Sequence, residues 1–239
     1  MVTGAAQGLG WAMASAFAQA GAAVVLVDQA AGVAASARQL AGEGRRALGL
    51  HVDVRDEAAF SAAFDQAVQA FGAVDVMVNN AARTPSAALW EISAQEWDDV
   101  MAVNLRGTFF GCRIAGRHMR ERGYGRIINL ASLAGQQASS ATGAHYAASK
   151  AGILALTRTF AAELASCGVT VNAIAPAAID TPVLQALPED RRSALAQSIP
   201  LGRFGHPDEV AGAALYLASD AAGFITGATL DVNGGRLMR

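Results

Sequence analysis

The 239-residue sequence predicts an α/β fold, in which a single domain is built on a doubly wound, seven-stranded parallel sheet flanked by helices. Two observations support this prediction. Short runs rich in branched apolar residues alternate along the whole chain with longer segments of helical periodicity. In addition, no low-complexity linker or internal repeat divides residues 1–239, and a domain of this class can reach that length without splitting.

The strands are predicted where short apolar runs end at turn residues. Only Met1 and Val2 precede a glycine-rich stretch that begins at Thr3, so the first strand is expected to be truncated to a stub. The second candidate, 23–28, reads Ala-Val-Val-Leu-Val-Asp and is typical of a buried strand. The other strand candidates are 46–52, 74–79, 125–131, 169–174 and 228–232.

The helices are predicted from apolar residues that recur on one face. In the first helix Leu9, Met13 and Phe17 have this spacing, and Gly21 ends the pattern. Asp56 is a predicted N-cap, and Ser93-x-x-Glu96 has the form of a capping box. The later helices are predicted at 30–42, 56–71, 93–122, 145–166 and 207–219.

One long connection, 176–206, is interrupted by Pro182, Pro188 and Pro200 and is predicted to be a lid loop over the site. Leu184 and Leu187 are its apolar candidates for substrate contact.

Composition argues against several classes of function. A net charge of −2 does not suit a protein that gathers nucleic-acid phosphates. The uncharged stretch 8–27 has no basic residue before it and changes from a helical to a strand pattern, which argues against a signal peptide or a membrane span. Neither the two cysteines, Cys112 and Cys167, nor the four histidines have metal-ligand spacing, so no metal is expected. Reduced thiols favour the cytoplasm.

The stretch Thr3-Gly4-Ala5-Ala6-Gln7-Gly8-Leu9-Gly10 is predicted to bind a diphosphate. Glycines allow the backbone to approach the anion closely, and the helix that follows presents free N–H groups. Asp28 ends the next strand, where a carboxylate accepts hydrogen bonds from ribose hydroxyls and repels a 2′-phosphate. NAD is therefore favoured over NADP as the cofactor.

Tyr146 and Lys150 are four residues apart on a predicted helix and therefore share a face. A neighbouring ammonium favours a phenolate, so we expect Lys150 to lower the pKa of Tyr146 and to fit it for proton transfer. Taken alone, this pair is compatible with an ordinary surface contact on a helix.

Several motifs occur together with this pair, and the combination resembles the short-chain dehydrogenase/reductase family over the whole chain. They are Thr3-Gly4-x-x-x-Gly8-x-Gly10, Asp53-Val54, Asn79-Asn80-Ala81, Asn104, Ser132, Tyr146-x-x-x-Lys150 and Pro176, in this order. The resemblance implies a Rossmann-type fold, a nicotinamide cofactor, and hydride transfer between that cofactor and a carbonyl or alcohol carbon.

The resemblance also implies roles for individual residues. Tyr146 is the expected general acid/base, Lys150 binds the nicotinamide ribose, and Ser132 holds the substrate oxygen. Asn104 is expected to hold a water that links Lys150 to solvent.

Further residues are assigned to the cofactor by the same resemblance. Asp53 and Val54 are expected at the adenine, Asn80 and Ala81 at the adenosine ribose and the loop, and Ile179 with Thr181 at the carboxamide. The full set of expected cofactor residues is Thr3, Gly4, Gln7, Gly8, Leu9, Gly10, Asp28, Asp53, Val54, Asn80, Ala81, Pro176, Ile179 and Thr181.

Three functions are compatible with the sequence. The leading one is NAD-dependent oxidation of a secondary alcohol, such as a polyol, a sugar alcohol or a hydroxy acid. The alternatives are an NADPH-dependent 3-oxoacyl carrier-protein reductase and a nucleotide-binding sensor without catalysis. Family resemblance further suggests a homotetramer, and the expected partner is a small-molecule alcohol or ketone. Candidate substrate contacts are Arg83, Ala134, Gln137, Thr142, His145, Leu184 and Leu187.

Overall fold

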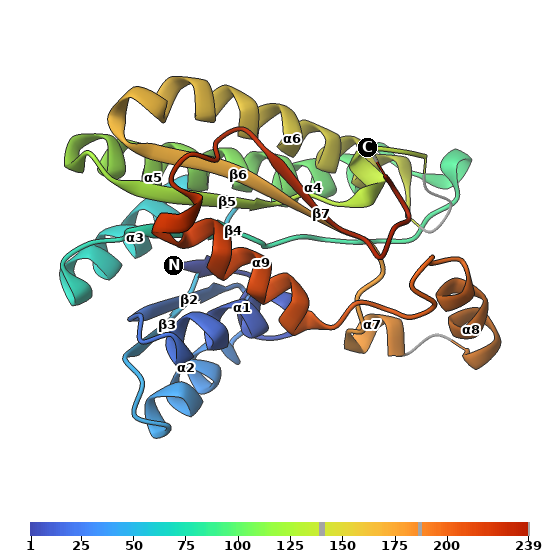
Figure 1. Cartoon of the computed structure of the whole chain (residues 1–239), viewed down its shortest axis with the longest axis horizontal. Helices are drawn as coiled ribbons and strands as arrows, with labels where there is room; N and C mark the ends of the chain where they lie inside the picture. Colours follow the sequence, from blue (N-terminus) through green and yellow to red (C-terminus); the bar gives the residue numbers. More distant parts are fainter. Residues whose placement is uncertain (139–141, 186–187, 239) are drawn as a thin grey trace.

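The computed structural model describes residues 1–138, 142–185 and 188–238, and it confirms the predicted fold class (Figure 1). Seven strands form one parallel sheet in the order β3-β2-β1-β4-β5-β6-β7. The strands are β1 (Val2–Thr3), β2 (Val24–Asp28), β3 (Ala47–His51), β4 (Val76–Asn79), β5 (Gly125–Leu130), β6 (Val169–Pro176) and β7 (Thr229–Val232).

The first strand is a two-residue stub, as predicted, and it lies in the middle of the sheet. Val2 pairs with Leu26 of β2 on one side and with Val78 of β4 on the other. The strand order changes direction at this point, because β1 leads to β2 on one side and β4 lies on the other. In sheets of this type, ligands bind outside the carboxyl ends of the strands at such a switch point.

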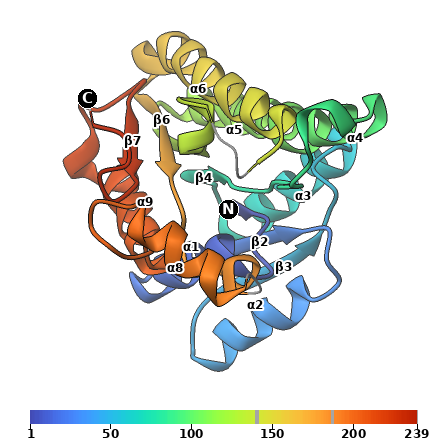
Figure 2. The ribbon, with the colours of Figure 1, turned by 90° about the vertical axis from the view of Figure 1, so that its right-hand side faces the viewer.

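Helices cover both faces of the sheet (Figure 2). On one face, α1 (Gly8–Gln19), α2 (Val33–Gly42) and α9 (Pro207–Ala218) share a core with β2 that includes Met13, Leu26 and Leu40. On the other, α3 (Glu57–Phe71), α5 (Gly107–Arg122) and α6 (Ala144–Leu164) pack around Phe60, Met77 and other buried residues. Full burial of side chains of this size stabilises the fold by about 1.5–3 kcal/mol each.

The predicted helix 93–122 is wrong as a single α-helix. The segment contains α4 (Ala94–Met101), a π-helical segment (Ala102–Arg106) and then α5. A π-helical turn holds one residue more than an α-helical turn, and such segments occur often at functional sites. Apolar spacing does not reveal it, because the pattern on each side remains helical.

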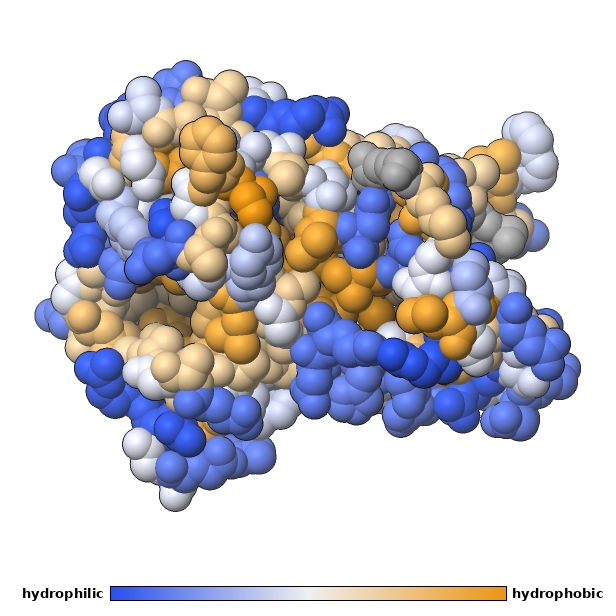
Figure 3. Space-filling view, viewed as in Figure 1, coloured by the Kyte–Doolittle hydropathy of each residue, from blue (hydrophilic) through white to orange (hydrophobic). Residues whose placement is uncertain are grey.

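The connection predicted as a lid loop contains two short helices, α7 (Pro182–Gln185) and α8 (Glu189–Gln197). Its two ends meet, since the Asp180 N–H donates to the Gly205 carbonyl at 2.8 Å. A guanidinium nitrogen of Arg192 in α8 lies 3.8 Å from a carboxylate oxygen of Asp180, which places α8 beside the start of this connection. Figure 3 shows hydrophobic residues gathered in the hollow between this region and the body of the domain. In the described part of the chain, none of the helices combines the length and apolar character that a membrane crossing requires.

Candidate active site

The loop between β1 and α1 is tied to the segment that follows β4. The Thr3 hydroxyl accepts hydrogen bonds from the N–H groups of Asn80 and Ala81, both at 3.0 Å. In return, the Asn80 amide donates to the carbonyls of Thr3 at 2.9 Å and Gly4 at 3.1 Å. The two segments therefore form one unit at the switch point, although β1 is short.

Gly10 permits the close contact that holds this loop. A Cβ atom on Gly10 would lie 2.1 Å from the Gly4 carbonyl oxygen and 2.6 Å from Nδ2 of Asn80. Gly8 faces open space, since a Cβ there would meet no described atom within 4 Å. The first-turn N–H groups of α1 have no acceptor within the helix, and they lie beside this space. The residues therefore fit a diphosphate, which needs close backbone approach and free N–H donors.

Asp28 lies at the carboxyl end of β2 and faces the glycine loop. One carboxylate oxygen accepts the Ala6 N–H and the other accepts the Ala30 N–H, each at 2.9 Å. Each oxygen keeps a further lone pair for a hydroxyl group. The other loop residues follow the backbone, with Gln7 exposed and Leu9 half-buried against the core.

The residues expected around the rest of the cofactor lie at strand ends in the same region. The Arg55 guanidinium pairs with Asp53 at 2.6 Å and holds the pKa of that carboxyl below its usual range. Val54 is buried. Pro176 ends β6, and Ile179 is buried. The Thr181 carbonyl accepts the N–H groups of the last two residues of α7, Leu184 and Gln185.

Ser132, Tyr146 and Lys150 come together just after β5. The Ser132 hydroxyl accepts the Ala134 N–H at 3.1 Å and is also hydrogen-bonded to the Tyr146 phenol. The Lys150 ammonium lies 5.5 Å from the centre of the Tyr146 ring and donates to the Leu130 carbonyl at 2.6 Å. The predicted pairing of Tyr146 with Lys150 on one helix face is therefore present.

The expected direction of the Tyr146 pKa is wrong for this structure. Burial raises the pKa of Tyr146 above its usual value, and hydrogen bonds with Ser132 and Thr84 offset part of that rise. Burial also lowers the pKa of Lys150 to about 7. The Lys150 ammonium is directed to the Leu130 carbonyl, so desolvation of the phenol outweighs the expected attraction between the phenolate and the ammonium.

A pH-dependent stability follows from the buried Lys150. The pKa of Lys150 is about 7 in the folded protein, against 10.5 for a lysine in water, so the unfolded chain binds more protons between these values. Lys150 therefore makes the wild-type protein more stable as pH rises from 7 to 10. We expect the Tm of Lys150→Met minus that of wild type to be larger at pH 7 than at pH 10. Thermal unfolding at both pH values measures this, and an unchanged difference would contradict it.

Asn104 is fully buried in the π-helical segment and joins two parts of the site. Its side-chain oxygen accepts the Arg83 N–H at 2.8 Å, and its amide donates to the Arg83 carbonyl and to the Ser149 hydroxyl, both at 3.0 Å. Ser149 in turn donates to the Tyr146 carbonyl at 2.7 Å. The water-holding role expected of Asn104 stays a prediction, whereas its contacts show a link from β4 to the tyrosine helix.

The residues expected to contact substrate differ in their exposure and in their partners. Ala134 adjoins Ser132, Gln137 is exposed, and Thr142 and Leu184 are half-buried. Arg83 pairs with Asp99 at 3.3 Å, and Leu187 lies outside the described residues. His145 is fully buried beside Gly143 and Glu96, and its expected contact with substrate stays a prediction.

One residue beside the phenol was missed. Thr84 is exposed, and its hydroxyl is hydrogen-bonded to Tyr146. Its position just after Asn80 and Ala81, where the chain leaves β4, was the available signal. Within the described residues, no group of three or more His, Cys, Asp or Glu side chains is arranged to hold a metal ion.

Comparisons with known proteins cover nearly the whole chain. Residues 4–236 match the model of a family described as enoyl-(acyl carrier protein) reductase. The chain is 44% identical over 236 residues to cis-4-hydroxycyclohexanecarboxylate dehydrogenase of Sinomonas cyclohexanicum, which covers 98% of this chain and 94% of that protein. It is also 44% identical over 239 residues to D-threitol dehydrogenase of Mycolicibacterium smegmatis, with 98% and 91% covered.

The fold of the chain is also similar to that of a solved structure. It is a 3-oxoacyl-[acyl-carrier protein] reductase with bound NAD from Brucella melitensis, with a TM-score of 0.92 and 39% sequence identity. The match covers 99% of this chain and 90% of that one.

Proposed function

Because the chain belongs to the short-chain dehydrogenase/reductase family, we propose that it transfers a hydride between NAD and a secondary alcohol or ketone. Polyols, sugar alcohols and hydroxy acids are the proposed substrate classes. The observation that carries the proposal is the meeting of Ser132, Tyr146 and Lys150 after β5, beside a glycine loop that fits a diphosphate.

Each residue has a proposed part in the reaction. When bound, the nicotinamide ring supplies or accepts the hydride. The Tyr146 phenol gives its proton to the carbonyl oxygen in reduction, and the Tyr146 phenolate takes the proton of the alcohol in oxidation. Ser132 is hydrogen-bonded to the Tyr146 phenol, and its hydroxyl holds the carbonyl or alcohol oxygen of the substrate beside that phenol. Lys150 binds the nicotinamide ribose hydroxyls, and Asn104 fixes the helix that carries Tyr146.

The preference for NAD is proposed from Asp28. Its carboxylate lies at the edge of the glycine loop, where it can accept hydrogen bonds from the two ribose hydroxyls and would repel a 2′-phosphate. The neutral Gln7 in the same loop offers a 2′-phosphate no charge.

Replacing Asp28 with Asn is expected to weaken NAD use by about tenfold in KM, which corresponds to about 1.4 kcal/mol. The amide nitrogen cannot accept a hydrogen bond, so one of the N–H groups of Ala6 and Ala30 loses its acceptor, and a ribose hydroxyl loses charge assistance. The measurement is KM for NAD and for NADP in both proteins. An Asn variant whose ratio of the two KM values equals that of wild type would contradict the proposed role.

The oxidation assay tests the proposed function directly. Purified protein is mixed with NAD and a panel of alcohols, polyols and hydroxy acids that includes D-threitol and cis-4-hydroxycyclohexanecarboxylate, the compounds named for two relatives. We expect NADH to form with at least one of them. Acetoacetyl thioester with NADPH or NADH is the parallel assay.

The reductase alternative is supported by the similarity to the Brucella melitensis protein. That protein holds NAD, so NAD binding by itself does not separate the two functions. Faster reduction of the acetoacetyl thioester with NADPH than oxidation of any alcohol with NAD would overturn our choice. Nucleotide binding without turnover in either direction would favour the sensor, although Asn104, Ser132, Tyr146 and Lys150 are all present.

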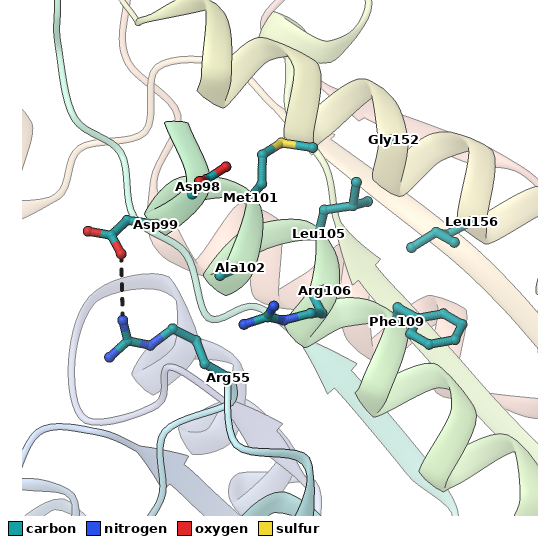
Figure 4. A pocket seen from close by; sticks show the side chains of 10 residues that line it. All are labelled: Arg55, Asp98, Asp99, Met101, Ala102, Leu105, Arg106, Phe109, Gly152 and Leu156. Carbon is teal, nitrogen blue, oxygen red and sulfur yellow. Dashed lines mark ion pairs between the residues drawn. The ribbon is translucent and has the colours of Figure 1, made fainter. Parts of the chain in front are cut away.

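We also propose a homotetramer in which α4, α5 and α6 pair with the same helices of a second copy. Figure 4 shows the side chains that line a pocket at these helices, among them the apolar Met101, Leu105, Phe109 and Leu156 and the charged Arg55, Asp98, Asp99 and Arg106. The volume of this pocket is about 700 Å³. Apolar residues gathered on outer helix faces are typical of protein interfaces. The proposed compartment is the cytoplasm, which suits the two free cysteines, one of them buried.

A charge on this surface is expected to change the assembly. Leu156→Arg places a guanidinium at the apolar part of this pocket, beside Leu105 and Phe109, where an interface would leave it without water. Light scattering is expected to give a smaller mass for this variant than for wild type, with the fold preserved by circular dichroism. An unchanged mass would remove these helices from the proposed interface.

A further inference from the structure

The helix that carries Tyr146 begins without a capping side chain. Its N-cap is Gly143, and Ala144, His145 and Tyr146 occupy the first three helical positions. The N–H groups of these positions have no acceptor within the helix and usually depend on an N-cap side chain. Here the imidazole of His145 takes over, since its Nδ1 accepts the Tyr146 N–H at 2.9 Å.

Burial and the neighbouring Gly143 restrict the orientation of the His145 ring. The residue is fully buried, and a Cβ atom on Gly143 would fall 2.3 Å from Cε1 and 2.6 Å from Nδ1 of the ring. The glycine that leaves the helix without a cap therefore makes the room for the imidazole that replaces it. A ring confined in this way keeps a fixed direction toward the Tyr146 N–H.

Glu96 faces the second nitrogen of the ring. Because Nδ1 accepts a hydrogen bond, the neutral imidazole carries its proton on Nε2. Nε2 lies 3.5 Å from Oε1 of Glu96, which comes from the first turn of α4. Only the first of the two contacts of the predicted capping box, from the Glu96 N–H to the Ser93 hydroxyl, is present. Ser93 accepts the Glu96 N–H at 3.1 Å, whereas the Glu96 carboxylate faces His145.

The other backbone polar atom of Tyr146 is also held. Its carbonyl accepts the Ser149 hydroxyl at 2.7 Å, and Ser149 is held by Asn104. His145 therefore holds the backbone N–H of Tyr146, and Ser149 holds its backbone carbonyl. Both His145 and Ser149 contact the helical run 94–106, His145 through Glu96 at its start and Ser149 through Asn104 near its end.

We propose that His145 and Glu96 are positioning residues for Tyr146, which hold the backbone of the tyrosine so that its phenol stays beside Ser132. The inference rests on the proposed function, in which that phenol transfers the proton. A catalytic group displaced by about 1 Å can lose about a hundredfold in rate, so a loose backbone at this residue has a large effect on turnover.

The test compares variants that keep or remove the acceptor. His145→Leu removes both nitrogens, whereas in His145→Asn the side-chain oxygen stands close to the position of Nδ1 and can accept the Tyr146 N–H. With the best alcohol of the panel, we expect His145→Leu to lower kcat by about a hundredfold and His145→Asn to recover most of it. The Kd for NADH, followed by tryptophan fluorescence, should stay within about twofold. Glu96→Leu, on the half-exposed side of the pair, is expected to show a smaller loss of kcat.

A control and a spectroscopic signal separate positioning from packing. Phe64→Leu removes core volume in α3 and should lower Tm without changing kcat. The protein has three tyrosines, so labelling with [13Cζ]tyrosine gives three signals, and Tyr146→Phe assigns the one of interest. We expect the Tyr146 signal to shift in His145→Leu and Glu96→Leu and to stay in Phe64→Leu.

The outcomes are distinct. The proposal is overturned if folded His145→Leu keeps the wild-type kcat, or if the Leu and Asn variants are equally impaired while the Tyr146 signal stays in place. If His145→Leu does not fold, the same two measurements on Glu96→Leu decide. If the wild-type protein oxidises nothing in the panel, the proposed function fails, and the Tyr146 signal still shows whether His145 and Glu96 hold the tyrosine.

Discussion

Replacing Tyr146 with Phe is expected to lower kcat by about a thousandfold, within the range that general acid–base groups contribute. The variant keeps the ring over which the Lys150 ammonium lies at 5.5 Å and loses only the hydroxyl that is hydrogen-bonded to Ser132 and Thr84. The fold and the affinity for NADH should therefore be preserved. The measurements are kcat with the best alcohol of the panel, the Kd for NADH and the Tm.

Tyr124→Phe is the matched control for this loss. Tyr124 lies at the opposite end of β5 from Ser132, and the Arg126 guanidinium stands 4.6 Å from the centre of its ring. Loss of its hydroxyl should leave kcat unchanged. A Tyr146→Phe protein that turns over at the wild-type rate would remove the phenol from the mechanism.

Gly10→Ala is expected to abolish tight cofactor binding, with a rise of at least about a hundredfold in the Kd for NADH. The added methyl group would stand 2.1 Å from the Gly4 carbonyl oxygen, which is backbone and cannot move aside without opening the loop. The same movement breaks the hydrogen bonds between Asn80 and the loop. We expect a loss of stability of about 1–3 kcal/mol, typical of overpacking.

Gly32→Ala is the matched control for Gly10→Ala. Gly32 precedes α2 with a φ of −65°, and a Cβ there would meet no described atom within 4 Å. Its Kd for NADH and its Tm should match those of wild type. Equal nucleotide affinity in Gly10→Ala and wild type would show that the loop around Gly4 and Gly10 does not hold the diphosphate.

The sequence was sufficient for features that depend on local pattern. The seven strands were predicted because each apolar run is short and bounded, and the stub at Val2–Thr3 follows from its position before the glycine loop. Tyr146 and Lys150 share a helix face because a spacing of four residues places them there. Each of these features is determined within a few residues of chain.

Features that depend on distant contacts were missed. The burial of His145 results from its packing against Glu96 of another helix, and adjacent residues do not reveal that. The raised pKa of Tyr146 and the lowered pKa of Lys150 come from desolvation in the assembled fold. Helix α7 has only four residues and α8 is short and polar, so their periodicity is weak beside the prolines that suggested a loop.

The π-helical segment Ala102–Arg106 also limits how the chain can vary in length. A π-helical turn holds one residue more than an α-helical turn, so deletion of one residue from it would restore regular α-helical hydrogen bonding and leave α4 and α5 in their orientation. Asn104 lies inside this segment and holds Ser149, so such a deletion would act on the tyrosine helix through Asn104, a residue that never touches a substrate. Natural or engineered indels should therefore be tolerated in the surface turns that join other elements and selected against between residues 102 and 106.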